Sequence, residues 1–383
     1  MKPGKRAIFY SLSVFLTTLL IAGCGGGGGK AGTTSTPAQS TTISGVAAAG
    51  WPLTGNVTIK DSRGVTKTVT IGVSGLYSID VTGMAAPFVL MASGTIAGVS
   101  IQICSGATQA DIGGNINITP LTDLIISNVA GQMAANYFSS GNFSNLTADN
   151  LNAQDVRLQA VLQPISSGAP GFPASSSDLL RASFFLTNNT GLDAVIDLLT
   201  ITDNSTTNSA TITNVTNQQT VTANFATQTY TGTFSNATTT AQSVTDISSI
   251  INFFNNLSEL FATSLPSATN AQLTSLFDIG TFLNNGQSLS AFLTALTSNS
   301  TNIGLTLNGL SILALDPVAG TATVNFTTNK SGTTQIMKFV LVNGSWLAEG
   351  NQNGNTGGGG GGIFTGTVSG GSGIVAGETQ DFR

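Results

Sequence analysis

Residues 42–104 contain short runs in which apolar and polar side chains alternate. The alternation is clear over residues 57–60 and returns over residues 68–73 and 76–81. Because side chains two positions apart point to the same face of a strand, each run predicts a β-strand with one buried face. Turn-forming Asp, Ser and Gly residues separate the runs. We therefore expect an all-β sandwich over residues 42–106.

This segment resembles the carboxypeptidase regulatory-like family, whose fold is a transthyretin-like β-sandwich. The resemblance is carried by Ile43-Ser44-Gly45-Val46, by Pro52-Leu53-Thr54-Gly55-Asn56-Val57-Thr58-Ile59, by Asp61 with Gly64, and by Gly75-Leu76-Tyr77-Ser78-Ile79. The sequence departs from the family at Gly72-Val73-Ser74. The family is an accessory module without catalytic residues, so the resemblance implies a scaffold or a ligand contact.

A second region, residues 115–240, mixes the two periodicities. Residues 115–119 continue as a strand, and Thr119-Pro120 predicts a helix start, because threonine caps helices and proline fits their first turn. Apolar residues then recur at helical spacing as far as Met133. Further elements are expected as helices from Thr147, from Ser176 and over 190–199, and as strands within 210–234.

The third region, residues 241–352, predicts helices followed by an antiparallel sheet. A long helix starts near Val244, carries one apolar face and stops at Pro266. Asn343-Gly344 predicts a hairpin turn. The other expected elements are helical runs over 273–277 and 289–296 and strands over 303–315, 322–328 and 335–342.

This third region is similar to nuclear transport factor 2-like domains at Asn343-Gly344-Ser345-Trp346 and Gly350-Asn351-Gln352. That resemblance implies a cone, and the fold serves both enzymes and binding modules. The fold class we expect is therefore multi-domain: an all-β transthyretin-like sandwich followed by a mixed α+β region with helices and an antiparallel sheet. A Gly-rich tail, residues 353–383, follows, in which residues 363–368 could add a strand.

The N-terminus indicates a lipoprotein signal peptide over residues 1–23. Lys2, Lys5 and Arg6 precede an apolar run that is too short for a comfortable membrane span, and Ala22-Gly23 precede Cys24. This pattern resembles a bacterial lipobox, which implies lipidation of Cys24 and attachment to a membrane. Gly25, rather than aspartate, follows Cys24, which implies the outer membrane. Residues 24–41 are a flexible linker of Gly, Ser and Thr.

Composition narrows the chemistry. Only 8% of the residues are charged, the net charge is −5, and histidine is absent. Without histidine there is no Ser-His-Asp or Cys-His catalysis and no histidine-containing zinc site. The sequence lacks the stripe of basic residues that is typical of nucleic-acid binding, so nucleic acid is not expected as a partner. The two cysteines are Cys24 and Cys104, and lipidation of Cys24 would leave Cys104 as a buried, unreactive thiol.

Few residues suggest a site. Asp193 and Asp197 are four apart and share a helix face, but a solvated or capping role is favoured over an acid–base pair. Asp123, Asp149 and Asp155 are expected in similar capping or exposed positions. Trp346 is expected inside the sheet. Trp51 packs in a loop or stacks on a sugar or protein; both readings stay open.

Two functions are compatible with these features. The first is a non-enzymatic cell-envelope lipoprotein that binds a protein or glycan, or has a structural role, with no catalytic residues, metal or cofactor. The alternative is a secreted carboxylate-dependent hydrolase with its pocket in the C-terminal α+β domain and its acids among Asp278, Asp316 and Glu349. Lys330 and Lys338 are expected to be exposed, and therefore poor general bases.

Overall fold

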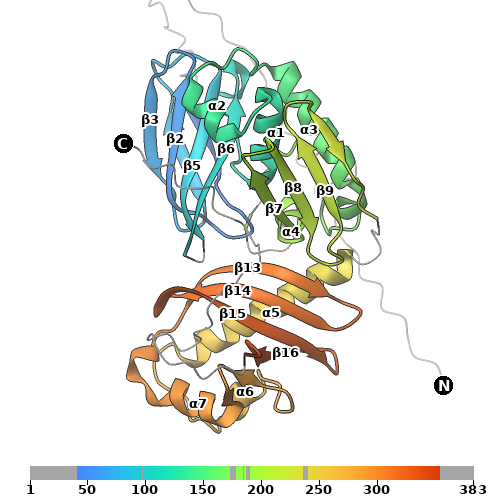
Figure 1. Cartoon of the computed structure of the whole chain (residues 1–383). Coiled ribbons are helices and arrows are strands. Elements are labelled where there is room, and N and C mark those ends of the chain that lie inside the picture. Colours follow the sequence, from blue (N-terminus) through green and yellow to red (C-terminus); the bar gives the residue numbers. More distant parts are fainter. Residues whose placement is uncertain are drawn as a thin grey trace, which may run out of the picture. The chain divides into compact units, whose positions relative to one another are not determined.

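The computed structural model describes residues 41–96, 98–172, 178–183, 185–186, 190–235 and 240–353. The fold is mixed, with several antiparallel sheets and a smaller share of helix (Figure 1). The expectations for the signal peptide, for Cys24 and for the strand 363–368 lie outside the described residues. Ser176 lies outside them too, but residues 178–183 are described and form a turn, so the helix expected from Ser176 does not continue there. Within them, no helix combines the length and the apolarity that a membrane span requires.

Two antiparallel sheets form the first part of the described chain. One pairs β1 (Thr42–Val46) with β4 (Leu76–Asp80). The other has the order β3-β2-β5-β6. Its strands are β2 (Thr54–Asp61), β3 (Thr66–Thr70), β5 (Phe88–Ile96) and β6 (Val99–Ala107). The alternation of residues 57–60 and 76–81 was thus a correct signal, since Val57, Ile59, Tyr77 and Ile79 are all buried in one cluster.

Residues 114–118 lie parallel to β1 and add to its sheet. Ile116 N–H donates to the Ser44 carbonyl, and Tyr77 donates its buried hydroxyl to the Ile116 carbonyl. Gly45 is required here, because a Cβ at this position would lie 1.8 Å from the Ile116 oxygen. The expected strand 115–119 is therefore a run of isolated bridges, with Asn115 facing Ser44 and Ile118 facing Ala47.

Helices follow the sandwich. After the short 3-10 helix η1 (Gln109–Asp111), the helix α1 (Pro120–Ala130) begins as expected, with Thr119 capping Thr122 N–H. Helix α1 packs against β6, and its residues from Leu121 to Val129 are all buried. The other helices are α2 (Ala134–Ser140) and α3 (Ala148–Ser166), and Thr147 caps α3 as expected.

A short helix and a four-stranded meander complete this part. Helix α4 (Gly191–Asp197) is shorter than the expected 190–199, because Leu199 already opens β7. The meander has the order β10-β9-β8-β7. Its strands are β7 (Leu199–Asn204), β8 (Ser209–Asn214), β9 (Thr220–Asn224) and β10 (Thr229–Thr231).

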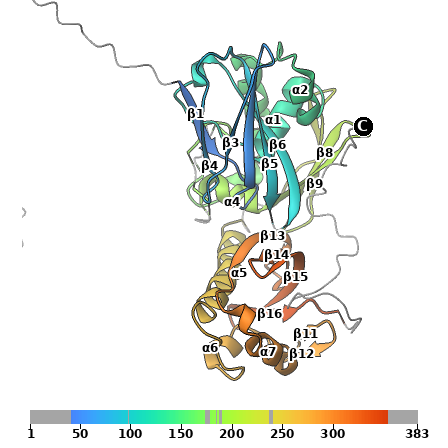
Figure 2. The same ribbon diagram turned by 90° about the vertical axis from the view of Figure 1, so that its left-hand side faces the viewer.

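The C-terminal part packs the long helix α5 (Thr240–Leu260) on one face of the sheet β13-β14-β15-β16 (Figure 2). The strands of that sheet are β13 (Leu307–Asp316), β14 (Thr321–Thr328), β15 (Ser331–Val342) and β16 (Ser345–Gly350). Smaller elements are α6 (Ala271–Thr274), β11 (Leu283–Asn284), β12 (Gln287–Ser288), α7 (Leu289–Ser298) and η3 (Ser300–Asn302).

Aromatic side chains fill the space between α5 and the sheet. Phe254 lies 4.8 Å from Phe326, and Phe253 lies 5.1 Å from Phe339, measured between ring centroids. The expected turn at Asn343-Gly344 is present, with φ values of 51° and 81°. Trp346 is buried as expected, and its Nε1 donates to Asp246 Oδ1 at 3.0 Å, which ties β16 to α5.

Candidate functional site

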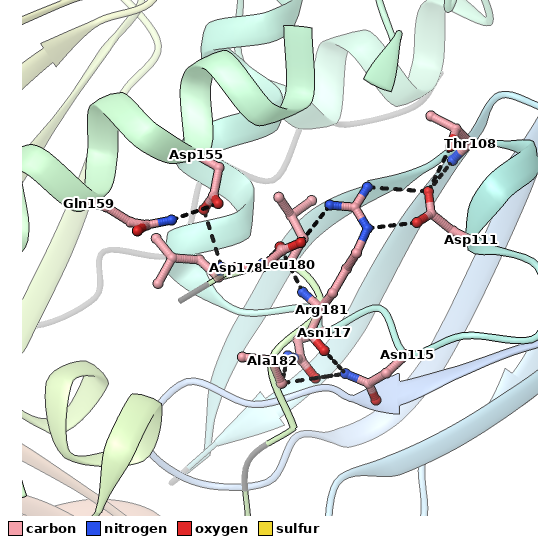
Figure 3. A network of polar contacts seen from close by, with 11 residues as sticks. Thr108, Asp111, Asn115, Asn117, Asp155, Gln159, Asp178, Leu180, Arg181 and Ala182 are labelled. Carbon is pink, nitrogen blue, oxygen red and sulfur yellow. Dashed lines mark hydrogen bonds and ion pairs between the residues drawn. The ribbon is translucent and has the colours of Figure 1, made fainter. Parts of the chain in front are cut away.

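A polar network joins residues 178–182 to the loop that follows β6 (Figure 3). The Arg181 guanidinium lies between two carboxylates. Its Nε donates to Asp111 Oδ1 at 2.6 Å and its Nη1 donates to Asp178 Oδ2 at 2.8 Å. A further contact from Nη2 to Asp111 Oδ2 at 3.4 Å makes the Asp111 pair bidentate, the geometry in which arginine binds carboxylate best.

Asp111 is buried, and every bond it accepts holds it in place. Its Oδ2 accepts from Thr108 N–H at 2.6 Å and from the Thr108 hydroxyl at 2.9 Å. Burial alone would raise the pKa of Asp111, but the bonds from Arg181 and Thr108 outweigh burial and hold the pKa below its usual value. Asp111 is therefore an anion that fixes Arg181.

Two asparagines hold the backbone of the same segment. Asn117 donates from its side chain to the Ala182 carbonyl at 2.6 Å and from its backbone to the Leu180 carbonyl at 2.7 Å. Asn115 Nδ2 donates to the Arg181 carbonyl at 3.1 Å. Because both asparagines belong to the stretch that pairs with β1, residues 178–182 are bonded directly to the sandwich.

Asp155 of α3 approaches the segment from another side. Its Oδ1 accepts from Leu179 N–H at 3.2 Å, and its Oδ2 accepts from Gln159 Nε2 at 2.7 Å. Burial, and after it the negative charge of Asp178, raise the pKa of Asp155 to about 7. The prediction of an exposed or capping Asp155 is wrong, because Leu179 and Leu180 cover this part of α3 in the core.

Every charged group of this network is bonded to the chain itself. Arg181, Asp111, Asp155 and Asp178 hold either backbone groups or one another, and no nucleophile lies among them. The arrangement is suited to clamping residues 178–182, and we call it the Arg181 clamp. The sequence contained one local signal for it, the spacing of three between Asp178 and Arg181; Asp111 is distant along the chain.

Asp123 was also placed wrongly by the expectation of a capping or exposed role. It lies in the first turn of α1, but it is buried, and its Oδ1 accepts from Cys104 N–H at 2.6 Å. Burial, and then the charge of Asp203, raise its pKa well above the usual value. Cys104 is buried as expected, and burial raises the pKa of its thiol. Asp149, by contrast, is exposed as expected.

The structure also corrects the expectation of a solvated or capping role for Asp193 and Asp197. Asp193 is fully buried rather than solvated, since α4 is enclosed on most sides by the core. Asp197 is half-buried and lies so close to the loop before Trp51 that a Cβ on Gly50 would come within 2.8 Å of its Oδ1. Burial, and then the charge of Asp193, raise the pKa of Asp197 well above its usual value.

The structure brings together two of the three acids of the hydrolase hypothesis. Asp278 Oδ2 and Glu349 Oε1 each lie 2.5 Å from the Thr281 hydroxyl, which donates to one of them at a time, and both acids are half-buried. Asp316 instead lies at the turn after β13, where it accepts from Val318 and Ala319 N–H. Lys330 and Lys338 are exposed as expected.

An exposed apolar surface surrounds Trp51. The indole is half-buried, and the depression beside it is lined by apolar side chains, among them Val46 and Pro52, and by three polar ones, Thr54, Ser74 and Asn308. Three side chains of this surface project into solvent, with exposed fractions of 101% for Val73, 53% for Leu76 and 71% for Phe185. None of the described residues that line the depression is charged. We call the group Trp51, Val73, Leu76, Phe185 and Leu186 the Trp51 surface.

No set of three or more Cys, Asp or Glu side chains among the described residues is arranged to hold a metal ion. Comparison of the chain with protein-family models, with curated proteins and with solved structures gave no match. The function is therefore inferred from the geometry of the described residues.

Proposed function

We propose that this chain is a non-enzymatic cell-envelope lipoprotein, anchored through Cys24, that binds a protein partner through the Trp51 surface. The observation that carries the proposal is the exposure of Val73, Leu76 and Phe185 next to Trp51 on a surface without charge. Several exposed apolar side chains gathered around one aromatic ring are a feature of protein-interaction sites. Interface cores are depleted of charge and enriched in aromatic residues, which fits this surface.

We also propose a fold family for the sandwich and one for the C-terminal part. Two facing sheets around one core, with Tyr77 inside, support a carboxypeptidase regulatory-like, transthyretin-like sandwich over residues 42–106. A helix packed on a four-stranded antiparallel sheet supports a nuclear transport factor 2-like domain in the C-terminal part. In this assignment the sandwich supplies Trp51, Val73 and Leu76 of the binding surface and residues 185–186 supply the rest, while the C-terminal domain has a structural or second binding role.

Photo-crosslinking tests the binding proposal. A photoreactive amino acid at Val73, in the full-length protein in its host envelope, should give a discrete protein adduct identifiable by mass spectrometry. The matched control places the same group at Val318, which is also fully exposed but lies on a different turn. The adduct should be lost when Trp51→Ala and Phe185→Ala are introduced together. An adduct with a glycan would show that the partner is a glycan and not a protein. No specific adduct, or one unaffected by the two substitutions, would contradict the proposal.

The hydrolase alternative has one observation in its favour, the meeting of Asp278 and Glu349 at the Thr281 hydroxyl. Two close carboxylates are the usual basis of general acid–base hydrolysis without histidine. The purified mature protein would then show hydrolase turnover that Asp278→Asn with Glu349→Gln abolishes. Asp316→Asn is the control, since Asp316 binds only its own turn. Turnover that behaves in this way would replace the non-enzymatic proposal.

A further inference from the structure

The Trp51 surface and the Arg181 clamp are consecutive in the sequence. Phe185 and Leu186 follow Ala182, the last clamped residue, by three and four positions. Three residues reach at most about 10 Å, so fixing Ala182 limits where Phe185 can lie. Ala182 is itself fixed, because its carbonyl accepts from Asn117 Nδ2 at 2.6 Å.

Leu186, at the other end of this short segment, contacts the sandwich. The Cδ1 atom of Leu186 would lie 2.9 Å from a Cβ on Gly75, so Leu186 packs directly over the turn between β3 and β4. Gly75 has a φ of +78°, and its lack of a side chain leaves the space that Leu186 occupies. Val73 and Leu76 of the same turn line the depression together with Trp51 and Phe185.

The clamp supplies the directional part of the attachment. Leu179 and Leu180 are buried, but apolar burial does not fix a segment in one orientation. Directional bonds do. Asn115 and Asn117 hold the backbone carbonyls of this segment, and the bidentate pair between Arg181 and Asp111 adds a charged contact of defined geometry, with Asp111 held in turn by Thr108.

We infer that Arg181 is a positioning residue of the Trp51 surface: by binding Asp111 and Asp178 it sets where Phe185 and Leu186 lie against Trp51. The biological meaning of this inference rests on the proposed function, but the positioning itself does not. Arg181 touches none of the surface residues in its own polar contacts; it acts by fixing the described residues 178–182, from which Phe185 is three positions away.

Protonation of Asp155 should modulate the clamp. The charged groups that act on this carboxylate are Asp178 and Arg181 on the clamped segment, and the titratable Tyr230 of β10 lies near it. When Asp155 is charged, it repels Asp178, the carboxylate that also binds Arg181. The Trp51 surface should therefore be held more firmly in mild acid than in mild base.

Acrylamide quenching of Trp51 fluorescence tests both statements without any partner. The chain has two tryptophans, Trp51 and Trp346; Trp346 is buried, so a Trp51→Phe variant measures its small contribution as a baseline. Phe185→Ala serves as the positive control, because it removes a large side chain that lines the same depression as the indole. Arg157→Ala is the matched control, since it removes an arginine that donates only to the Gln228 carbonyl on the exposed side of α3.

We expect Arg181→Ala to raise the quenching constant of Trp51, though by less than Phe185→Ala because Asn115 and Asn117 still hold the segment, while Arg157→Ala leaves it unchanged. The parent protein should show quenching that rises between pH 6 and 8, and Asp155→Asn should be flat over that range. Arg181→Lys, which keeps the charge but not the fork, should fall between parent and Arg181→Ala. If Arg181→Ala does not fold by circular dichroism, Arg181→Lys and the pH profile decide.

Equal quenching in Arg181→Ala, Arg157→Ala and the parent would overturn the inference, and so would a parent profile that is flat with pH. A positive result without any crosslinked partner would keep the positioning role and contradict only the proposed function. If a partner binds Arg181→Ala as tightly as the parent and quenching is unchanged, the proposed function is kept and the positioning role is contradicted.

Discussion

Replacing Asp155 by asparagine should stabilise this protein in mild base and do much less in mild acid. Asp155 is 6% exposed and accepts hydrogen bonds from Leu179 N–H and Gln159 Nε2. Asparagine has nearly the same shape and keeps an oxygen for Leu179 N–H, while Gln159 can turn its amide to pair with the new one. The substitution therefore removes mainly the charge.

The magnitude follows from the pKa of the Asp155 carboxyl, which rises from 3.8 to about 7 in the folded protein. A group with a raised folded pKa contributes stability that is fully present below pH 3.8 and is lost as the pH rises through about 7. Each unit of difference corresponds to about 1.4 kcal/mol, so the charged carboxylate costs roughly 4 kcal/mol at pH 8 and roughly 2 kcal/mol at pH 5. The advantage of asparagine should thus grow by about 2–3 kcal/mol between pH 5 and pH 8.

The assay is urea unfolding of parent and variant at both pH values, followed by circular dichroism. Comparing the two proteins at each pH cancels the titration of all other groups. Asp149→Asn is the matched control, because Asp149 lies on the same helix but is exposed, and its effect should be small. If the free energy of unfolding of Asp155→Asn differs from that of the parent by the same amount at pH 5 and pH 8, the interpretation that ionisation of the buried Asp155 destabilises the fold is refuted.

Three further outcomes are expected. Cys24→Ala should move the protein from the membrane to the soluble fraction, and continued membrane association would show that the anchor lies elsewhere. Gly45→Ala should destabilise the sandwich severely, by several kcal/mol, since the added methyl would lie 1.8 Å from the Ile116 carbonyl oxygen; normal thermal unfolding would contradict this contact. Asp246→Ala should cost about 1–3 kcal/mol because it leaves the buried Trp346 Nε1 without its acceptor, whereas Asp246→Asn should restore most of the loss; equal unfolding of the two variants would argue against the bond.

Local patterns determined much of the secondary structure. Thr119-Pro120 marked the start of α1, Thr147 the start of α3, and Asn343-Gly344 the turn before β16. Each is a short-range effect, since a cap bonds a residue of its own first turn and a hairpin turn needs positive φ at adjacent residues. The period of two likewise identified the buried faces of β2 and β4, because strand geometry alone sets it.

Tertiary packing decided which of the helix carboxylates are buried. Asp123, Asp155 and Asp193 occupy helix positions that are exposed or capping in an isolated helix, yet all three are buried, because other elements cover them. Nothing near Asp155 in the sequence identifies Leu179 as the segment that covers it. Whether a polar position faces water depends on what packs over the helix, which its own sequence does not encode.

The candidate site was decided in the same way. Trp51 could be singled out as a rare aromatic in a loop, but the exposure of Phe185 beside it and the Arg181–Asp111 pair could not, since those partners are 134 and 70 positions apart. Short-range sequence determines which residues can form a strand, a cap or a turn. Which distant side chains meet depends on how the elements pack, and in this protein that packing formed both the clamp and the surface it positions.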